Sequence, residues 1–233
     1  MLVAVPPLLA VYIVAIILAL DVDKSYTQYL VLAPLAYMLG SIPWGFMIVK
    51  MSQGKDIREF GSGRIGTSNA LRTAGLKAAV PVLALDISKG VVAVLMARAI
   101  ADTPTAEVVA GLLVLAGHIW PVFLGFKGGR GIGTGAGGVA VIAPIPLIIG
   151  LGVFALVTGT TRLLSLGSLL SLSAMAILVL VQTMITDLSP TYLIYIGVGT
   201  AMVFWQHRDN IKRLLKGTER RLGRPAERLV GQA

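Results

Sequence analysis

Residues 166–185 read "LGSLLSLSAMAILVLVQTMI", twenty consecutive residues without a charged side chain. About twenty apolar residues in a helix cross the hydrocarbon core of a bilayer. The whole chain is 56% hydrophobic and 13% charged, whereas a soluble domain carries about 25% charged residues. No segment alternates as a membrane strand would, so the sequence predicts an all-α integral membrane protein. Further apolar runs lie at 2–20, 28–49, 91–100 with the turn before it, 105–124, 139–160 and 191–206.

Connections of two kinds alternate along the chain. One kind is rich in Lys and Arg, and the other contains acidic residues with Lys24 as its only basic residue. Because basic loops remain cytoplasmic, the first kind and both termini are expected inside, and the net charge of +9 reflects topology rather than nucleic-acid binding. The basic connections are 50–78, the segment with Lys127 and Arg130, Arg162 and the tail after 207; the acidic ones are 21–27, 101–107 and 186–190.

This alternation requires the apolar segment 132–160 to cross the membrane twice. The two prolines of "APIP" (Ala143–Pro146) would break or sharply kink a helix there. Residues 132–143 cover only about 18 Å as a helix, against a hydrocarbon core of about 30 Å, so short spans are expected around Ala143–Pro146. With 2–20 retained as a helix the count is about eight spans, and a cleaved signal peptide is the alternative for 2–20.

The chain divides into three parts on this basis. Residues 1–27 form an extra N-terminal transmembrane helix with a short external link, and 28–206 form the membrane domain. Residues 207–233 carry a cytoplasmic motif and a basic tail, of which 207–229 could form an interfacial helix on anionic lipid.

The segment 126–138, "FKGGRGIGTGAGG", contains seven glycines in thirteen residues. It matches G-x-G-x-x-G literally, but that dinucleotide fingerprint requires a preceding strand, and the flanks here are membrane helices. Glycine backbone lets N–H groups approach an anion closely, and Lys127 and Arg130 add positive charge. We predict anion binding at 128–131 and close helix packing at 133–138.

A second glycine-rich polar stretch, "KDIREFGSGRIGTSNALRTAG", spans 55–75. Its glycines, hydroxyl groups and arginines suit an anion, and a helix that starts after Ser68 or Asn69 would add its positive N-terminal end. The alternative is an ordinary loop in which Ser68 or Asn69 caps the next helix.

Several ionisable residues lie at the predicted cytoplasmic ends of spans. His207 and Asn210 in "HRDN" are three apart and share a helix face, and His118 lies near the end of 105–124. Asp86 and Lys89 are expected to form a buried structural ion pair. The sequence shows no metal-ligand set, no His-x4-Asp pair and no G-x-S-x-G elbow.

Six short sequence blocks, taken in their order along the chain, resemble the motifs of the bacterial acyl-phosphate:glycerol-3-phosphate acyltransferase family (the PlsY type). The resemblance covers about 28–219 and implies a seven-span core in the plasma (inner) membrane, to which 2–20 adds a helix. It also implies a cytoplasmic active site that transfers an acyl chain from acyl-phosphate to glycerol 3-phosphate, with lysophosphatidate and phosphate as products. The blocks are "GSIPWG" at 40–45, "IREFGSGRIGTSNALRTAG" at 57–75, "LDISKG" at 85–90, "GHIWPVFLGFKGGRGIGT" at 117–134, "SLGSL" at 165–169 and "HRDNIKRLLKGTE" at 207–219.

The resemblance also implies roles for individual residues. His207, Ser62 and Asn210 fall on its catalytic positions, with His207 accepting a proton or orienting the group that does. The sequence departs from the usual family pattern at Arg64, where Asn is usual, and at Arg130, where Lys is usual. The implied substrate- and phosphate-binding residues are Arg72, Asn69, Lys127, Gly128, Gly129, Arg130, Gly131 and Ser168.

An acyl-phosphate is already activated, so no covalent nucleophile, metal or cofactor is expected. The expected partners are the two substrates and membrane lipid, with no nucleic acid, and the chain is expected to be a monomer. Two alternatives remain open at this point. One is a related acyltransferase with another donor or acceptor. The other is a transporter of an anionic solute, which would place polar residues at the bilayer midplane and on both faces.

Overall fold

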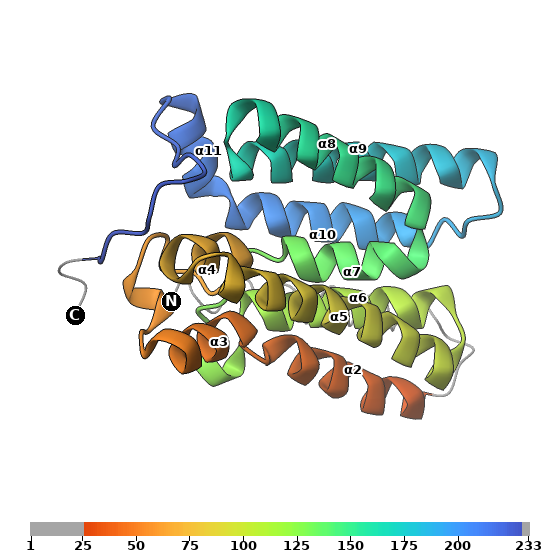
Figure 1. Cartoon of the computed structure of the whole chain (residues 1–233). Coiled ribbons are helices and arrows are strands. Elements are labelled where there is room, and N and C mark those ends of the chain that lie inside the picture. Colours follow the sequence, from red (N-terminus) through yellow and green to blue (C-terminus); the bar gives the residue numbers. More distant parts are fainter. Residues whose placement is uncertain (1–25, 230–233) are drawn as a thin grey trace.

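The computed structural model describes residues 26–229, and this part of the chain is a bundle of helices (Figure 1). Its described residues form no β-strand, only an isolated bridge between Phe60 and Arg228. The all-α prediction is therefore confirmed. The helices are α2 (Tyr26–Ser41), α3 (Trp44–Gln53), α4 (Thr67–Ala74), α5 (Leu76–Ala101), α6 (Pro104–Ile119), α7 (Ile132–Ile142), α8 (Pro144–Thr161), α9 (Leu164–Ile185), α10 (Tyr192–Gln206) and α11 (Arg208–Leu215), with short 3-10 turns η1 (Ile57–Glu59) and η2 (Val122–Leu124).

Seven apolar segments follow one another along the described chain. Two of them, α7 and α10, are shorter than the rest, and the predicted helix over 2–20 lies outside the described residues. The predicted break at "APIP" is confirmed: α7 ends at Ile142 and α8 begins at Pro144, where a missing N–H leaves no helical hydrogen bond unmade. The segments long enough to cross a membrane are Thr27–Gln53, Leu76–Ala101, Pro104–Leu124, Pro144–Thr161 and Leu164–Ile185.

The first of these segments, which covers the apolar run predicted over 28–49, consists of two helices. α2 ends at Ser41 and α3 begins at Trp44, because Pro43 disfavours helical backbone at the preceding residue. The break leaves carbonyl groups without helical partners. Lys89 Nζ of α5 donates to two of them, Gly40 O at 3.0 Å and Ile42 O at 3.3 Å.

Helix α6 forms the centre of the bundle and is buried from Ala106 to Ile119. Small residues bring its neighbours close: a Cβ on Gly40 of α2 would overlap the Val114 carbonyl, and one on Gly137 of α7 would overlap the Ile87 carbonyl of α5. Gly138 likewise has no room for a Cβ beside Tyr195. Close packing, predicted for 133–138, is confirmed for Gly137 and Gly138.

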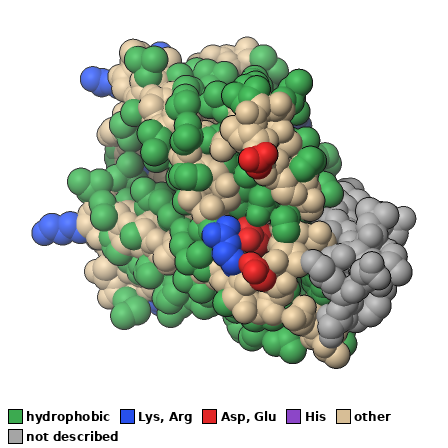
Figure 2. Space-filling model, turned by 90° about the vertical axis from the view of Figure 1, so that its right-hand side faces the viewer, with side chains coloured by type: hydrophobic (Ala, Val, Ile, Leu, Met, Phe, Trp, Pro, Cys, Tyr) green, Lys and Arg blue, Asp and Glu red, His purple; other side chains and the backbone are tan. Residues whose placement is uncertain are grey.

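The two ends of the bundle differ in chemistry. One end carries α3, α4, the loop 120–131, the Arg162 link and α11 (Figure 1), and we call it the motif end. Figure 2 shows the opposite end, where a few charged side chains gather near the centre of a mainly hydrophobic and polar surface. There Arg98 Nε pairs with Glu107 Oε1 at 2.8 Å, and the Tyr192 hydroxyl donates to Glu107 Oε2 at 3.0 Å.

The C-terminal tail is mostly extended, so the interfacial helix predicted over 207–229 is wrong beyond Leu215. We call residues 216–229 the strap. It leaves α11 through Gly217 at φ 68°, a left-handed conformation that suits glycine. Three backbone carbonyls then hold it: Leu222 N–H donates to Arg162 O at 2.7 Å, Ala226 N–H to Arg72 O of α4 at 3.0 Å and Leu229 N–H to Glu59 O of η1 at 2.7 Å.

Candidate active site

Asn69 shapes the loop that precedes α4. Its Nδ2 lies within hydrogen-bonding distance of the Ile57, Phe60 and Arg64 carbonyls at 3.1, 3.0 and 2.8 Å, and its Oδ1 accepts from the Ser62 N–H at 3.1 Å. Because Asn69 turns back into the loop, neither it nor Ser68 caps the helix. The predicted caps are therefore wrong: α4 begins at Thr67 with Gly66 as N-cap.

The glycine loop, residues 125–131, folds back on the end of α6. Gly128 N–H donates to Ile119 O at 3.1 Å and Gly129 N–H to His118 O at 3.0 Å. Gly131 ends the loop at φ 91° as the N-cap of α7, in a left-handed conformation that L side chains avoid. Arg130 is carried inward by this path, and Lys127 remains exposed.

Four arginines from different segments meet beside this loop, and we call Arg64, Arg72, Arg130 and Arg213 the cationic cluster. Burial, together with the charges of Arg64 and Arg213, lowers the pKa of Arg130 to about 10, and the carboxylate of Glu219 opposes that shift. Burial also lowers the pKa values of Arg64 and Arg72. Arg64, Arg72 and Arg130 stay cationic at neutral pH, so the cluster concentrates positive charge in partly desolvated surroundings.

Glu219 is the buried acid within the cluster. Its Oε1 accepts from Asn210 Nδ2 at 2.8 Å and its Oε2 from Arg213 Nε at 2.7 Å. Neither Arg213 nor Glu219 was predicted, because the sequence shows them only as members of a basic tail. The tail holds three acids, Asp209, Glu219 and Glu227, among its eight basic residues, so the sequence does not single out Glu219.

Several buried polar atoms here lack a hydrogen-bond partner. A buried donor without an acceptor is costly, and an anion with several oxygen atoms would accept from the donors in this set. The site thus has the chemistry of a phosphate site. The donors are Ser62 Oγ, Arg72 Nε, Arg130 Nε and Arg213 Nη2, and the remaining unpaired atom, Asn210 Oδ1, is an acceptor.

His207 lies at the junction of α10 and α11 and is only 3% exposed. Its Nδ1 is 2.8 Å from Val203 O, and since a carbonyl only accepts, Nδ1 carries the hydrogen. Burial, with the nearby Arg130 charge, lowers the pKa of His207 to about 4. The neutral ring therefore keeps Nε2 as a proton acceptor at neutral pH.

This pKa predicts a pH-dependent contribution to stability. Between pH 6.5 and about 4 the unfolded chain binds a proton at His207 and the folded chain does not, so stability falls as pH falls, by about 3 kcal/mol across the window. His207→Gln should remove this slope. Melting temperatures of both proteins in phosphate-free buffer would test it, and parallel curves from pH 4 to 7 would contradict it.

Ser168 is buried near the start of α9, and its Oγ donates to Leu164 O of its own helix at 2.9 Å. Arg72, Arg130, His207 and Asn210 are grouped around Glu219. Ser62 belongs to the loop that Asn69 holds, and Lys127 is exposed.

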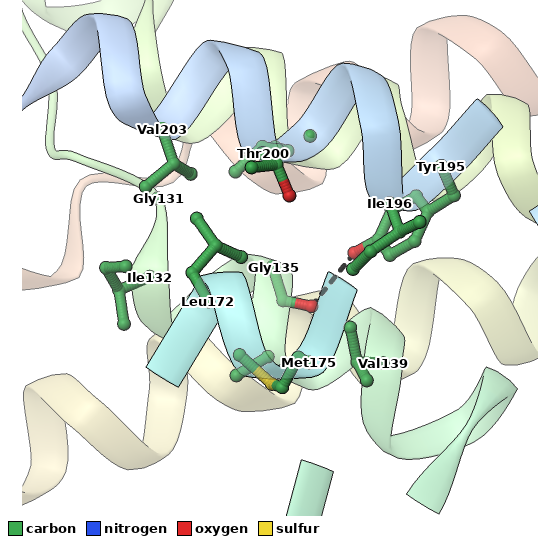
Figure 3. A pocket seen from close by; sticks show the side chains of 13 residues that line it. Gly131, Ile132, Gly135, Val139, Leu172, Met175, Tyr195, Ile196, Thr200 and Val203 are labelled. Carbon is green, nitrogen blue, oxygen red and sulfur yellow. Dashed lines mark hydrogen bonds between the residues drawn. The ribbon is translucent and has the colours of Figure 1, made fainter. Parts of the chain in front are cut away.

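An apolar pocket continues from the glycine loop into the membrane domain (Figure 3). Gly131 lies at its loop end, and Tyr195, whose hydroxyl donates to Gly135 O at 2.9 Å, lies at its deep end. From Gly131 to Val139 it follows α7 for about 12 Å at 1.5 Å per residue. Its lining comes from α6, α7, α9 and α10: Leu115, Gly131, Ile132, Gly135, Ala136, Val139, Leu172, Met175, Tyr195, Ile196, Gly199, Thr200 and Val203.

Comparisons with known proteins agree with this arrangement. A family model described as glycerol-3-phosphate acyltransferase matches residues 30–217. The chain is 41% identical over 211 residues to glycerol-3-phosphate acyltransferase 3 of Dehalococcoides mccartyi (strain CBDB1), covering 85% of this chain and 98% of that protein. It is 40% identical over 188 residues to the glycerol-3-phosphate acyltransferase of Desulforamulus reducens, covering 81% and 92%.

A solved structure is also similar. It is the crystal structure of PlsY (YgiH), an integral membrane glycerol 3-phosphate acyltransferase, in its glycerol 3-phosphate form, with a TM-score of 0.77 and 35% identity over 83% of this chain and 95% of that one. The lysophosphatidic acid form of PlsY gives a TM-score of 0.74 at 33% identity, with the same coverage. The predicted multi-pass membrane fold is confirmed, and the chain belongs to the glycerol-3-phosphate acyltransferase family.

Proposed function

We propose that the protein transfers an acyl chain from an acyl-phosphate to glycerol 3-phosphate, giving 1-acyl-glycerol 3-phosphate (lysophosphatidate) and phosphate, the first acylation of phospholipid synthesis. The observation that carries this proposal is the cationic cluster at the mouth of an apolar pocket. Both substrates bear phosphate, and one also bears a long apolar chain. The names of the two PlsY forms support this acceptor and product.

The phosphate groups are proposed to bind on two subsites of the cluster. Arg130, positioned by the glycine loop whose Gly128 and Gly129 N–H groups bond to α6, forms one, and Ser62 Oγ with Arg72 Nε forms the other. Each contributes buried donors that lack protein acceptors. Charge-assisted hydrogen bonds from guanidinium to phosphate are short and strong, so binding would satisfy these donors and offset the repulsion among the arginines.

The reaction needs no covalent step on the enzyme. The glycerol hydroxyl oxygen attacks the acyl carbonyl carbon, the carbon–oxygen bond to phosphate breaks, and phosphate leaves with the bonding electron pair. The hydroxyl proton passes to His207 Nε2 or to the departing phosphate. Asn210, held by Glu219, positions the substrate through its free Oδ1, and Ser168 is proposed to do so from α9.

The acyl chain is proposed to lie in the apolar pocket and to enter it sideways between spans. Gly131 belongs both to the glycine loop and to the pocket lining. A chain bound there would therefore place its carboxyl carbon beside the phosphate subsites. This continuity explains why small residues line the start of α7.

Gly199→Leu should block the pocket, and Gly197→Leu on the same helix provides a matched control. A Cβ on Gly199 would meet only Leu115 Cδ2 at 3.6 Å and would point into the pocket, whereas Gly197 is exposed with nothing within 4 Å. We expect the first variant to lose about tenfold in kcat/KM with a long-chain acyl-phosphate, about 1.4 kcal/mol, and much less with acetyl-phosphate. Equal losses for both donors would contradict this placement.

The identity of the acyl donor can be tested by comparing three candidate donors directly. The purified protein in lipid would be given glycerol 3-phosphate with acyl-phosphate, acyl-CoA or acyl carrier protein thioester, and lysophosphatidate would be measured. We expect product only with acyl-phosphate. Product from a thioester and none from acyl-phosphate would refute the donor, and no product from any donor would refute the function.

The motif end is proposed to face the cytoplasm, with the protein a monomer in the plasma membrane and both termini inside. Because the sequence contains no cysteine, single cysteines can report sidedness cleanly. An impermeant thiol reagent applied to intact cells should label Asp187→Cys and leave Lys216→Cys unlabelled. The reverse pattern would invert the topology.

A further inference from the structure

Three polar side chains form a buried chain next to the glycine loop, and the proposed function uses none of them. Lys89 Nζ lies 3.0 Å from Asp86 Oδ1, and His118 Nδ1 lies 3.4 Å from the same oxygen. Lys89, Asp86 and His118 are 2%, 3% and 3% exposed. The predicted Asp86–Lys89 ion pair is therefore confirmed, and His118 extends it from α5 to α6.

The two ends of this chain reach different parts of the fold. At one end, Lys89 donates to the carbonyls of Gly40 and Ile42, where α2 breaks before α3. At the other end, the His118 ring packs against Gly129, since a Cβ on Gly129 would overlap His118 Nε2. The same histidine accepts the Gly129 N–H with its backbone carbonyl.

The contact with Gly129 fixes the path of the loop. Gly128 and Gly129 lie between the end of α6 and Arg130. The separation between Gly129 and the His118 ring therefore sets the direction in which Arg130 points. The ring Nδ1 faces the Asp86 carboxylate at 3.4 Å without forming a hydrogen bond, and Lys89 anchors that carboxylate. An ion pair at this depth is costly to bury and strongly destabilising to break, which makes the anchor stiff.

We propose that His118, oriented by Asp86 and Lys89, is a positioning residue that holds the glycine loop in its anion-binding shape. The proposal rests on the proposed function for the identity of the anion. It predicts that the polar chain controls phosphate affinity as well as stability. A merely structural chain would affect stability alone.

Two adjacent glycines allow a sharp test. A Cβ on Gly129 would overlap the His118 side chain, whereas a Cβ on Gly128 would overlap the backbone carbonyls of His118 and Ile119. Shortening His118 can relieve only the first overlap. We expect Gly129→Ala to weaken binding of inorganic phosphate about tenfold, or about 1.4 kcal/mol. The double variant Gly129→Ala/His118→Ala should have the same phosphate affinity as His118→Ala alone. Gly128→Ala should be as weak with His118→Ala as without it.

Phosphate affinity would be read from the rise of melting temperature with phosphate concentration, which does not depend on turnover. The KM for acyl-phosphate should follow the same pattern. Equal coupling of His118→Ala with both glycine variants, or coupling with neither, would overturn the proposal. Phosphate binding without any lysophosphatidate formation would refute the proposed function instead and leave the positioning role supported.

A second pair of variants covers the case in which the glycine variants do not fold. Asp86→Asn and Glu107→Gln each neutralise a buried carboxylate that pairs with a cation, at opposite ends of the bundle. Both should lower the melting temperature. Only Asp86→Asn should also weaken phosphate binding, by about tenfold, and an equal effect of both on phosphate affinity would overturn the proposal.

Discussion

Replacing Arg130 with alanine is expected to lower kcat/KM by about a thousandfold, since a preorganised donor in a desolvated site contributes on that order to the transition state. Arg130 stands among Arg64, Arg72 and Arg213, and its Nε is buried without a partner. The phosphate it would contact gains negative charge as it leaves the acyl carbon. The measurement is steady-state turnover of acyl-phosphate and glycerol 3-phosphate by the purified variant in lipid.

Lys127→Ala is the comparison within the same loop. Lys127 is exposed, so its charge is screened by solvent and its removal should cost no more than about 1 kcal/mol. Arg130→Lys should fall between the two, because an ammonium keeps the charge and loses the planar fork. If the two alanine variants lost activity equally, the two basic residues would share the phosphate as the sequence suggested.

The difference in burial between Lys127 and Arg130 could not be predicted from the sequence. Both are basic residues in one glycine-rich segment, and composition treats them alike. Which of them points inward depends on the backbone path, above all on Gly131 at φ 91° and on the contacts of Gly128 and Gly129 with α6. Those contacts require α6 and the loop to be placed in space first.

The helices were predicted more fully than the site. Long apolar runs and the two prolines of "APIP" act locally, so the spans and the α7–α8 break followed from the sequence. The α2–α3 break depends on Pro43 together with Lys89, which lies 46 residues further along the chain. Glu219 could not be predicted as a site residue from the sequence, because the strap that carries it folds back across segments that are distant in the sequence.

Glu219→Ala is expected to be the most destabilising single change at the motif end. It removes the acceptor of Asn210 Nδ2 and Arg213 Nε and leaves the cationic cluster without its buried carboxylate. Losing one partner of a buried ion pair costs about 3–5 kcal/mol. Thermal denaturation in detergent would measure the loss, and Glu227→Ala, which removes an exposed acid of the same strap, should change stability by less than about 0.5 kcal/mol.

Glu219→Gln is a milder change that keeps one acceptor. Its amide oxygen can still accept from Asn210, whereas the bond from Arg213 Nε and the negative charge beside Arg72, Arg130 and His207 are lost. Inorganic phosphate supplies that charge from solution, so it should raise the melting temperature of Glu219→Gln more than that of the unaltered protein. If phosphate stabilised the two proteins equally, Glu219 would not share the cationic cluster with the bound anion, and its buried carboxylate would serve the fold alone.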